Sequence, residues 1–349
     1  MAGDNAKYEF PLHGVLIGFG NAARYAHLPL FKKNAYFVID AVVEPSGKRA
    51  KLAKNLLPDA MIYSDIDQVI TNKNFAFVDI CTPPCFHAEI ALKALKAGLH
   101  VFCEKPLATS FEIIPDLIDA AEKHHRVVFT VNNWKHAPIF AKAIGLVRQG
   151  QIGRVQSISL GVLRTPNSGG GLSHWRKIAE IAGGGILLDH GWHHLYLVLS
   201  IIRDVPVSAS AKMQYIGGSH LEDEVDLSVR FKNAEAHLHL TWRSTQRQNF
   251  GKIKGENGMI SINDDHLILH KNGLPPIRYD FPYALSKSSH HLEWMKPVIE
   301  DFRREILDIN VRGTNFTEAK WCARLISLAY RSQRENSRFI NVDSIPQYV

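Results

Sequence analysis

The first 131 residues alternate short apolar segments with segments of helical composition, and this alternation limits the possible folds more than any other feature of the sequence. Parallel strands need a long crossover connection, which is usually a helix, so alternation of this kind indicates a parallel sheet with helices on both faces. The segments expected to be strands are 15–17, 37–43, 75–80, 99–102 and 127–131.

The pattern changes after about residue 132. Several strand-like segments then follow one another with short turns, which favours antiparallel pairing. These segments are 154–163, 207–215, 224–231, 235–242, 258–263 and 266–270, and helices are expected at 137–149, 292–310 and 317–333. We therefore predict two domains: a doubly wound parallel sheet over 1–131, and an α+β domain for substrate binding and oligomerisation over 132–349, with a large, open, mostly antiparallel sheet.

Composition and charge exclude several classes of protein. With 46% hydrophobic and 21% charged residues, the chain has the composition of a folded globular protein. The net charge of +7 is dispersed rather than gathered into a basic tract, so we expect no nucleic-acid partner. No apolar run approaches the ~20 residues of a membrane span. The N-terminal residues also lack an apolar signal core, so we expect a cytoplasmic protein with no membrane partner and with its four cysteines reduced.

A glycine-rich motif lies between the first expected strand and the helix after it. Gly18, Gly20 and Ala23 have the spacing G-x-G-x-x-A, and Asn21 and Ala22 complete the turn. Glycines permit the tight turn and a close approach to a pyrophosphate, and the small third residue lets the helix pack on the strand. The N–H groups at the start of that helix then bind phosphate. The motif predicts a Rossmann domain that binds a dinucleotide.

The end of the second expected strand bears on the choice of cofactor. Glu44 lies 24 residues after Gly20, close to the ~20 expected for a carboxylate that accepts the adenosine ribose hydroxyls. This position favours NAD. Ser46, Lys48 and Arg49 follow directly and are able to cradle a 2′-phosphate, so NADP remains an alternative.

Two further motifs make a family resemblance specific. Cys103-Glu104-Lys105-Pro106 follows the strand at 99–102, and Gly183–His193 reads GGGILLDHGWH. Together with the glycine motif, they resemble the glucose–fructose oxidoreductase, inositol dehydrogenase and MocA family. The resemblance covers nearly the whole chain. It implies an NAD(P)-dependent dehydrogenase or reductase acting on CH–OH groups, with a cis bond between Lys105 and Pro106.

The resemblance also implies the catalytic residues, and general chemistry agrees with it. The family's lysine and its D-x-x-x-H pair correspond to Lys105, Asp189 and His193. Oxidation of an alcohol needs a base near neutral pH, which histidine provides, and an ammonium group stabilises the developing alkoxide. Asp189 and His193 are four residues apart, so on a helix they share one face.

The remaining site predictions place residues around these three. Besides the glycine motif and Glu44, the expected cofactor-binding residues are Thr82, Pro83, His87, Glu104 and Lys105. The expected substrate-binding residues are Trp134, Lys135, His174, Arg176 and His190. The family motif often ends in an aspartate where this chain has Tyr196, so one polar contact is expected to be missing. His190 and His194 have helical metal-ligand spacing but lack a suitable third ligand, and we predict no metal.

The function expected from these observations is hydride transfer between a nicotinamide and a hydroxyl or carbonyl group of a sugar, cyclitol or sugar derivative. Two alternatives stay open: an NAD-retaining glycosidase of the same family, and a dinucleotide-binding regulator without turnover. The expected partners are a small sugar or polyol and a second copy of the chain, as a homodimer or homotetramer.

Overall fold

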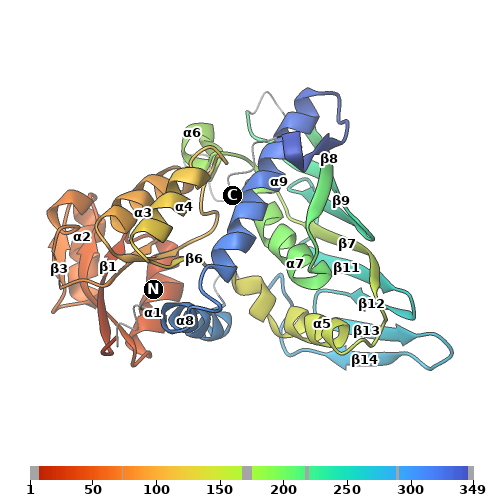
Figure 1. Ribbon diagram of the computed structural model, residues 1–349, viewed down its shortest axis with the longest axis horizontal. Coiled ribbons are helices and arrows are strands. Elements are labelled where there is room, and N and C mark those ends of the chain that lie inside the picture. The colour runs from red at the N-terminus through yellow and green to blue at the C-terminus, as the bar shows by residue number, and fades with distance from the viewer. Residues whose placement is uncertain (1–7, 73, 167–174, 217–219, 288–290, 345–349) are drawn as a thin grey trace. The chain divides into compact units, whose positions relative to one another are not determined.

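The computed structural model describes residues 8–72, 74–166, 175–216, 220–287 and 291–344. The chain divides into two compact units (Figure 1). The first unit comprises Met1–Leu107, Ile113–Val131 and His290–Thr317, and the second comprises Ala108–Glu112, Asn132–Ser289 and Glu318–Val349.

The first unit is built on a parallel sheet that has six strands within the described residues, in the order β3-β2-β1-β4-β5-β6. Its strands are β1 (Leu12–Ile17), β2 (Phe37–Val43), β3 (Met61–Tyr63), β4 (Phe77–Ile80), β5 (His100–Cys103) and β6 (Val128–Thr130). The strand order reverses between β1 and β4, and open α/β sheets bind ligands beyond the carboxyl ends of the strands at such a point. The predicted doubly wound parallel sheet is confirmed.

Helices cover both faces of this sheet (Figure 1). They are α1 (Leu28–Lys32), α2 (Gly47–Leu56), α3 (His87–Lys96), α4 (Ile114–Lys123) and α8 (Leu292–Leu307). The strands β4 and β5 are buried at every position, as expected where both faces are covered. The helix α3 ends before Gly98, whose φ of 84° is readily adopted only by glycine.

The helix α8 belongs to the first unit, whereas its place in the sequence assigned it to the second domain. Phe302 on α8 is 1% exposed and packs among phenylalanines from three strands. Its ring centroid lies 5.3 Å from that of Phe37, 5.1 Å from that of Phe102 and 5.6 Å from that of Phe129. Aromatic pairs at these distances stabilise a core beyond the burial of their surface. This long-range packing joins α8 to the parallel sheet.

The second unit contains a mixed sheet with nine strands among the residues described, in the order β14-β13-β12-β11-β7-β10-β9-β8-β15. Only the β7–β10 pair is parallel within that part of the chain. The strands are β7 (Val155–Leu163), β8 (Pro206–Gln214), β9 (Glu224–Phe231), β10 (Glu235–Thr241), β11 (Gln248–Gly255), β12 (Gly258–Ile262), β13 (His266–Lys271), β14 (Ile277–Asp280) and β15 (Ile340–Asn341). The predicted mostly antiparallel sheet is confirmed.

The described part of the second unit also contains helices. They are α5 (Pro138–Arg148), α6 (Ala179–Ala182), α7 (Trp192–Ile202) and the part of α9 (Thr314–Arg334) that follows Thr317. Alternate residues of β9 and β10 are buried and more exposed, as expected for strands with one covered face. None of the helices in the described parts of the chain is long and apolar enough to cross a membrane.

Two π-helical turns occur among the described residues, one in each unit. The turn Ala23–His27 leads into α1, and the turn Leu187–Gly191 leads into α7. A π-helical turn has i→i+5 hydrogen bonds and is frequent at functional sites. Both turns lie in segments for which the sequence predicts ligand-binding or catalytic residues.

Candidate active site

The loop after β1 has the backbone required of a dinucleotide-binding turn. Gly18 has a φ of 86°, and a Cβ at this position would lie 3.0 Å from the backbone of Cys81 and Thr82, which follow β4. A Cβ at Gly20 would instead meet nothing within 4 Å among the described residues. Packing therefore explains the glycine at position 18 but not at position 20, where close approach of a ligand would explain it.

The segment after Gly20 is helical from Asn21 onward, so N–H groups at the start of the helix point toward the loop. Ala23 is fully buried, as expected for a small residue at the contact of helix and strand. A cofactor phosphate placed at this helix start would be bound by backbone N–H groups. The residues present therefore fit the pyrophosphate of a dinucleotide.

Glu44 lies at the end of β2, as predicted, but its carboxylate already has partners. Oε2 accepts hydrogen bonds from Phe19 N–H at 2.8 Å and Arg49 Nε at 2.9 Å. Oε1 accepts from Ser46 N–H at 2.8 Å and from the second guanidinium nitrogen of Arg49 at 2.9 Å. Burial opposes the charged carboxylate, but the bonds from Arg49 and the backbone outweigh it and lower the pKa of Glu44. A ribose that binds Glu44 must displace Arg49, whose side chain is 52% exposed.

The segment after β4 contributes a hydroxyl group and a buried histidine. The buried Oγ1 atom of Thr82 has no hydrogen-bond partner among the described residues. A bound ligand would supply the partner that a buried hydroxyl group normally has. His87 is 1% exposed, and its ring nitrogens each lie 2.7 Å from a backbone carbonyl oxygen, those of Thr82 and Pro106. His87 therefore contacts two site loops rather than presenting its ring to solvent.

The Glu104-Lys105-Pro106 turn follows β5, the neighbour of β4 in the sheet. The peptide bond between Lys105 and Pro106 is cis, as the resemblance implies. Glu104 N–H donates to the carbonyl oxygen of Ile80 at 2.9 Å, and Glu104 Oε2 accepts from Lys105 N–H at 3.1 Å. The first unit thus brings the glycine loop, Thr82 and Lys105 to the carboxyl ends of three adjacent strands.

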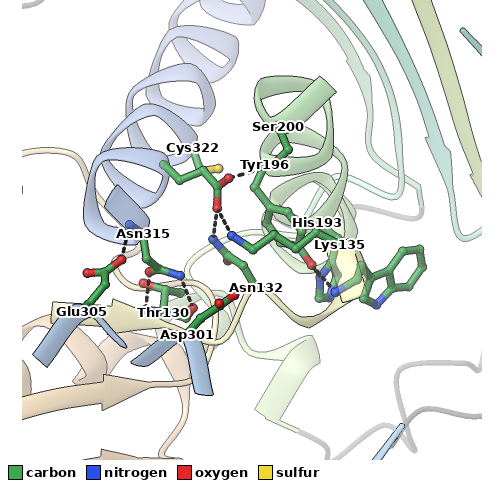
Figure 2. Close-up of polar contacts among 12 residues, drawn as sticks. Thr130, Asn132, Lys135, His193, Tyr196, Ser200, Asp301, Glu305, Asn315 and Cys322 are labelled. Carbon is green, nitrogen blue, oxygen red and sulfur yellow. Dashed lines mark hydrogen bonds and ion pairs between the residues drawn. The ribbon is translucent and has the colours of Figure 1, made fainter. Parts of the chain in front are cut away.

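In the second unit, His193 on α7 has a well-defined environment. Its ring stacks on that of Trp134, with centroids 4.8 Å apart and planes inclined by 20°. Its Nδ1 atom lies 2.8 Å from the hydroxyl oxygen of Tyr196, which also accepts the backbone N–H of Trp134 at 2.9 Å (Figure 2). His193 is 7% exposed and Tyr196 is fully buried. Tyr196 therefore makes a polar contact to His193 at the position where the family motif often ends in an aspartate.

Asp189 lies in the π-helical turn Leu187–Gly191, and His193 lies in the α-helix that follows. The prediction that these residues share one face assumed a regular α-helix, which this junction is not. The Oδ2 atom of Asp189 lies 3.9 Å from Nε of Arg176 and 3.9 Å from Nε2 of His190. Asp189 is thus surrounded by polar groups that the sequence assigned to substrate binding.

The amine of Lys135 is held by a partly buried carboxylate. Its Nζ atom lies 2.9 Å from Oε2 of Glu318, which also accepts from Asn132 at 3.0 Å (Figure 2). The other oxygen of Glu318 accepts from Ser200 at 2.7 Å. This network fixes the segment that carries Trp134 and Lys135. A direct contact of Lys135 with substrate stays a prediction, and His174 lies outside the described residues.

Arg164 is a residue of this region that sequence reasoning missed. It is 2% exposed, directly follows β7, and donates to the carbonyl oxygens of Leu163 at 2.8 Å and Gln248 at 3.2 Å and to Asn249 at 3.0 Å. Burial lowers the pKa of Arg164 to about 10, while Asp264 and Asp189 act in the opposite direction. The sequence signal that could have identified Arg164 is a basic residue directly after the alternating segment 154–163.

Comparisons with known proteins agree with both halves of the chain. Residues 12–132 match a family described as an oxidoreductase family with an NAD-binding Rossmann fold. Residues 140–261 match the GFO/IDH/MocA C-terminal domain. The two matches together span most of the chain, one in each sheet.

Individual relatives include sugar oxidoreductases. Levoglucosan dehydrogenase of Pseudarthrobacter phenanthrenivorans is 28% identical over 282 residues, which is 72% of this chain and 72% of that protein. The 1,5-anhydro-D-fructose reductase of Ensifer adhaerens is 26% identical over 200 residues, 56% of this chain and 60% of that protein. A solved levoglucosan dehydrogenase, in complex with NADH and levoglucosan, superposes with a TM-score of 0.81 at 25% identity, covering 96% of this chain and 100% of that one.

The fold, the glycine loop and these matches define an oxidoreductase with an NAD-binding Rossmann domain. Within that class, the chain belongs to the Gfo/Idh/MocA family.

Proposed function

We propose that the protein is an NAD-dependent dehydrogenase or reductase that transfers a hydride between nicotinamide and a CH–OH carbon of a sugar, cyclitol or sugar derivative. The observation that carries the proposal is the environment of His193: a nearly buried imidazole, stacked on Trp134 and hydrogen-bonded at Nδ1 to Tyr196. In this proposal, the imidazole of His193 exchanges the proton of the substrate hydroxyl.

Lys105 has the complementary role in this proposal. In the direction of oxidation, His193 accepts the hydroxyl proton, and the Lys105 ammonium stabilises the negative charge that develops during the reaction. When bound, NAD supplies the hydride acceptor. The turn between Glu104 and Pro106 fixes the backbone of Lys105 beyond the carboxyl end of β5, where open α/β sheets place ligands.

The cofactor is proposed to bind across the first unit. Backbone N–H groups of the loop and helix start formed by Gly18, Gly20, Asn21, Ala22 and Ala23 hold the pyrophosphate. Thr82, Pro83 and Glu104 are proposed to contact the nicotinamide end of the cofactor. His87 would hold these segments in place through its contacts with the carbonyl oxygens of Thr82 and Pro106. Glu44 takes the ribose hydroxyls after Arg49 moves away, which favours NAD over NADP because a buried carboxylate repels a 2′-phosphate.

The substrate class is inferred from polar side chains and from relatives. The Oδ2 atom of Asp189 lies 3.9 Å from the guanidinium group of Arg176 and 3.9 Å from the imidazole of His190. Several neighbouring hydroxyl groups on a ring match such a set. The named relatives act on levoglucosan and 1,5-anhydro-D-fructose, both cyclic sugar derivatives.

The second unit is proposed to bind substrate, and the more exposed face of its sheet to join copies of the chain in a homodimer or homotetramer. This division corresponds to the sequence boundary near residue 131, with α8 as an addition to the cofactor unit.

The test is NADH formation in the presence of a panel of anhydrosugars, inositols and free sugars, with NAD and NADP in parallel. Lys105→Met should lower turnover by about 10²–10⁴ and leave cofactor affinity within twofold. Lys123→Met, an exposed lysine at the end of α4, is the matched control and should behave as wild type. Near-normal turnover of Lys105→Met would remove this lysine from the mechanism, and tight NAD binding without any turnover would favour a regulator.

A further inference from the structure

A fully buried histidine connects two carboxylates beneath the Glu104-Lys105-Pro106 turn. His27 ends the π-helical turn Ala23–His27 and is 0% exposed. Its Nδ1 atom lies 2.9 and 3.0 Å from the two oxygens of Asp79, and its Nε2 atom lies 2.9 Å from Oε1 of Glu104. Asp79 is also 0% exposed and lies in β4. No step of the proposed reaction uses this cluster.

Proton counting shows what the cluster requires. Carboxylates only accept hydrogen bonds, so both ring nitrogens of His27 carry a proton unless one carboxyl group is itself protonated. Either arrangement holds two protons in the two contacts and gives His27, Asp79 and Glu104 a combined charge of −1. A buried unit of this kind is stable only while all of its members are present, because removing one leaves a charge or a donor unpaired.

Electrostatics agree with a charged ring. Burial is the largest single effect and disfavours imidazolium, but Asp79 and Cys81 together outweigh it and raise the pKa of His27 well above its ordinary value. Burial also acts to raise the pKa of Glu104, but the hydrogen bond from His27 outweighs it and lowers that pKa. The nearby Cys81 thiol, 3.8 Å from both Asp79 oxygens, stays protonated because burial raises its pKa.

A second buried histidine contacts the other end of the same turn. His87 begins α3, and its ring nitrogens lie 2.7 Å from the carbonyl oxygens of Pro106 and Thr82. The ring donates to at least one of these carbonyls in any protonation state. Glu104 is therefore held by His27 on one side, and Pro106 by His87 on the other, with Lys105 between them.

We propose that His27 and His87 are positioning residues that together clamp the Glu104-Lys105-Pro106 turn and so fix the direction of the Lys105 amine. The clamp rests on the proposed function in one respect, namely that Lys105 acts on the substrate. The link from His27 to Lys105 is continuous: His27 fixes one carboxylate oxygen of Glu104, and the other oxygen accepts Lys105 N–H at 3.1 Å.

The fold offers a matched control in His100. This histidine is also in the parallel sheet and 1% exposed, but it begins β5, at the end opposite the turn. Its Nδ1 accepts from Val127 N–H at 3.0 Å, and its Nε2 lies 3.0 Å from the hydroxyl group of Tyr8. His100→Asn therefore reports what loss of a buried histidine does to this sheet without touching the turn.

The experiment compares full-length His27→Asn, His87→Asn and His100→Asn after reductive ¹³C-methylation of lysines, followed by NMR. The Lys105 signal is assigned by its loss in Lys105→Arg. The clamp requires this signal to shift or broaden in His27→Asn and His87→Asn and to stay in place in His100→Asn. Where His27→Asn does not fold, the nearly isosteric Asp79→Asn replaces it, because Asp79 hydrogen-bonds to His27 and not, among the described residues, to the turn itself.

Measurements of kcat and of the Kd for NAD distinguish a loss of Lys105 positioning from a general loss of stability. With a substrate from the panel, both clamp variants should lose tenfold or more in kcat, and His27→Asn should keep the Kd for NAD within twofold, whereas His100→Asn should keep both kcat and Kd. An unmoved Lys105 signal in both clamp variants, or equal losses in all three, overturns the clamp. If wild type turns over no sugar, the proposed function fails, and the lysine signal still decides whether the clamp exists.

Discussion

The hydroxyl oxygen of Tyr196 lies 2.8 Å from Nδ1 of His193 and accepts the backbone N–H of Trp134 at 2.9 Å. One buried phenol thus joins the proposed proton acceptor to the segment on which its ring stacks. A tyrosine can donate to a neutral imidazole and accept from an imidazolium, whereas an aspartate can only accept when ionised. The replacement therefore supports His193 without placing a negative charge beside it.

Tyr196→Phe removes that contact and keeps the ring. It leaves a backbone donor and a ring nitrogen without the hydroxyl, and an unsatisfied buried group costs ~1–3 kcal/mol. We expect kcat to fall about tenfold or more, since each 1.36 kcal/mol is a factor of ten, while the Kd for NAD stays unchanged. Tyr283→Phe, at a 63% exposed position, is the control. Steady-state kinetics and cofactor titration measure both, and an unchanged kcat would show that Tyr196 serves stability alone.

His193→Asn should change the pH profile of oxidation. A neutral imidazole accepts the hydroxyl proton, so kcat/KM of wild type should rise from acidic to neutral pH and then level off. The variant should lose that ascending limb together with about 10²–10⁴ of the rate. The exposed His237→Asn should keep the wild-type profile. An ascending limb that survives with its midpoint unmoved would assign the proton to another group.

Glu44 and Arg49 should together determine whether the protein prefers NAD or NADP. Glu44→Ser removes the ribose acceptor and should weaken NAD about tenfold, because hydrogen bonds to charged groups contribute ~1.5–3 kcal/mol. Arg49→Ala removes the cation nearest a 2′-phosphate and should weaken NADP more than NAD. Lys51→Ala, an exposed position of α2, should change neither Kd. Titration of both cofactors measures this, and an Arg49→Ala variant with unchanged NADP affinity would contradict it.

His100 should make the first unit sensitive to acid. Burial, assisted by Arg126 and Arg312, lowers the pKa of His100 to about 3, below the ~6.5 expected in the unfolded chain. Between pH 6.5 and pH 3, His100 is therefore protonated in the unfolded chain but not in the folded one. The contribution of His100 to the free energy of unfolding is complete above pH 6.5 and decreases as the pH falls from 6.5 toward 3. His100→Asn should lower stability at pH 7 and flatten this acid slope. Urea unfolding at several pH values measures it, and an unchanged slope would assign acid sensitivity elsewhere.

Local sequence patterns were sufficient for some parts of the site and not for others. The glycine loop and the position of Glu44 follow from strand ends and spacing, and both were predicted. The partners of Glu44 were not, because they depend on which way the Arg49 side chain turns. The strand β11 was missed because its sequence, QNFGKIKG, has two glycines and no long apolar run.

Packing between distant segments could not be predicted from the sequence either. Phe302 is an ordinary apolar residue of a predicted helix, and only the folded chain shows that it completes a core of phenylalanines from the parallel sheet. The contacts of His27 join residues 52 and 77 positions apart. Hydrophobic periodicity assigns residues to elements but does not say which elements meet.

The proposed site depends on the number of residues in the two π-helical turns as well as on their side chains. Each turn holds one residue more than an α-helical turn would, and each precedes or contains a group on which the proposed chemistry depends. Deleting one residue without a proposed role, such as Ala26 or Leu188, would keep every functional side chain, yet it would turn the π-helical turn into α-helix and shift the groups within it. A survey by substitution alone would pass over this dependence, whereas single-residue deletions and insertions would expose it.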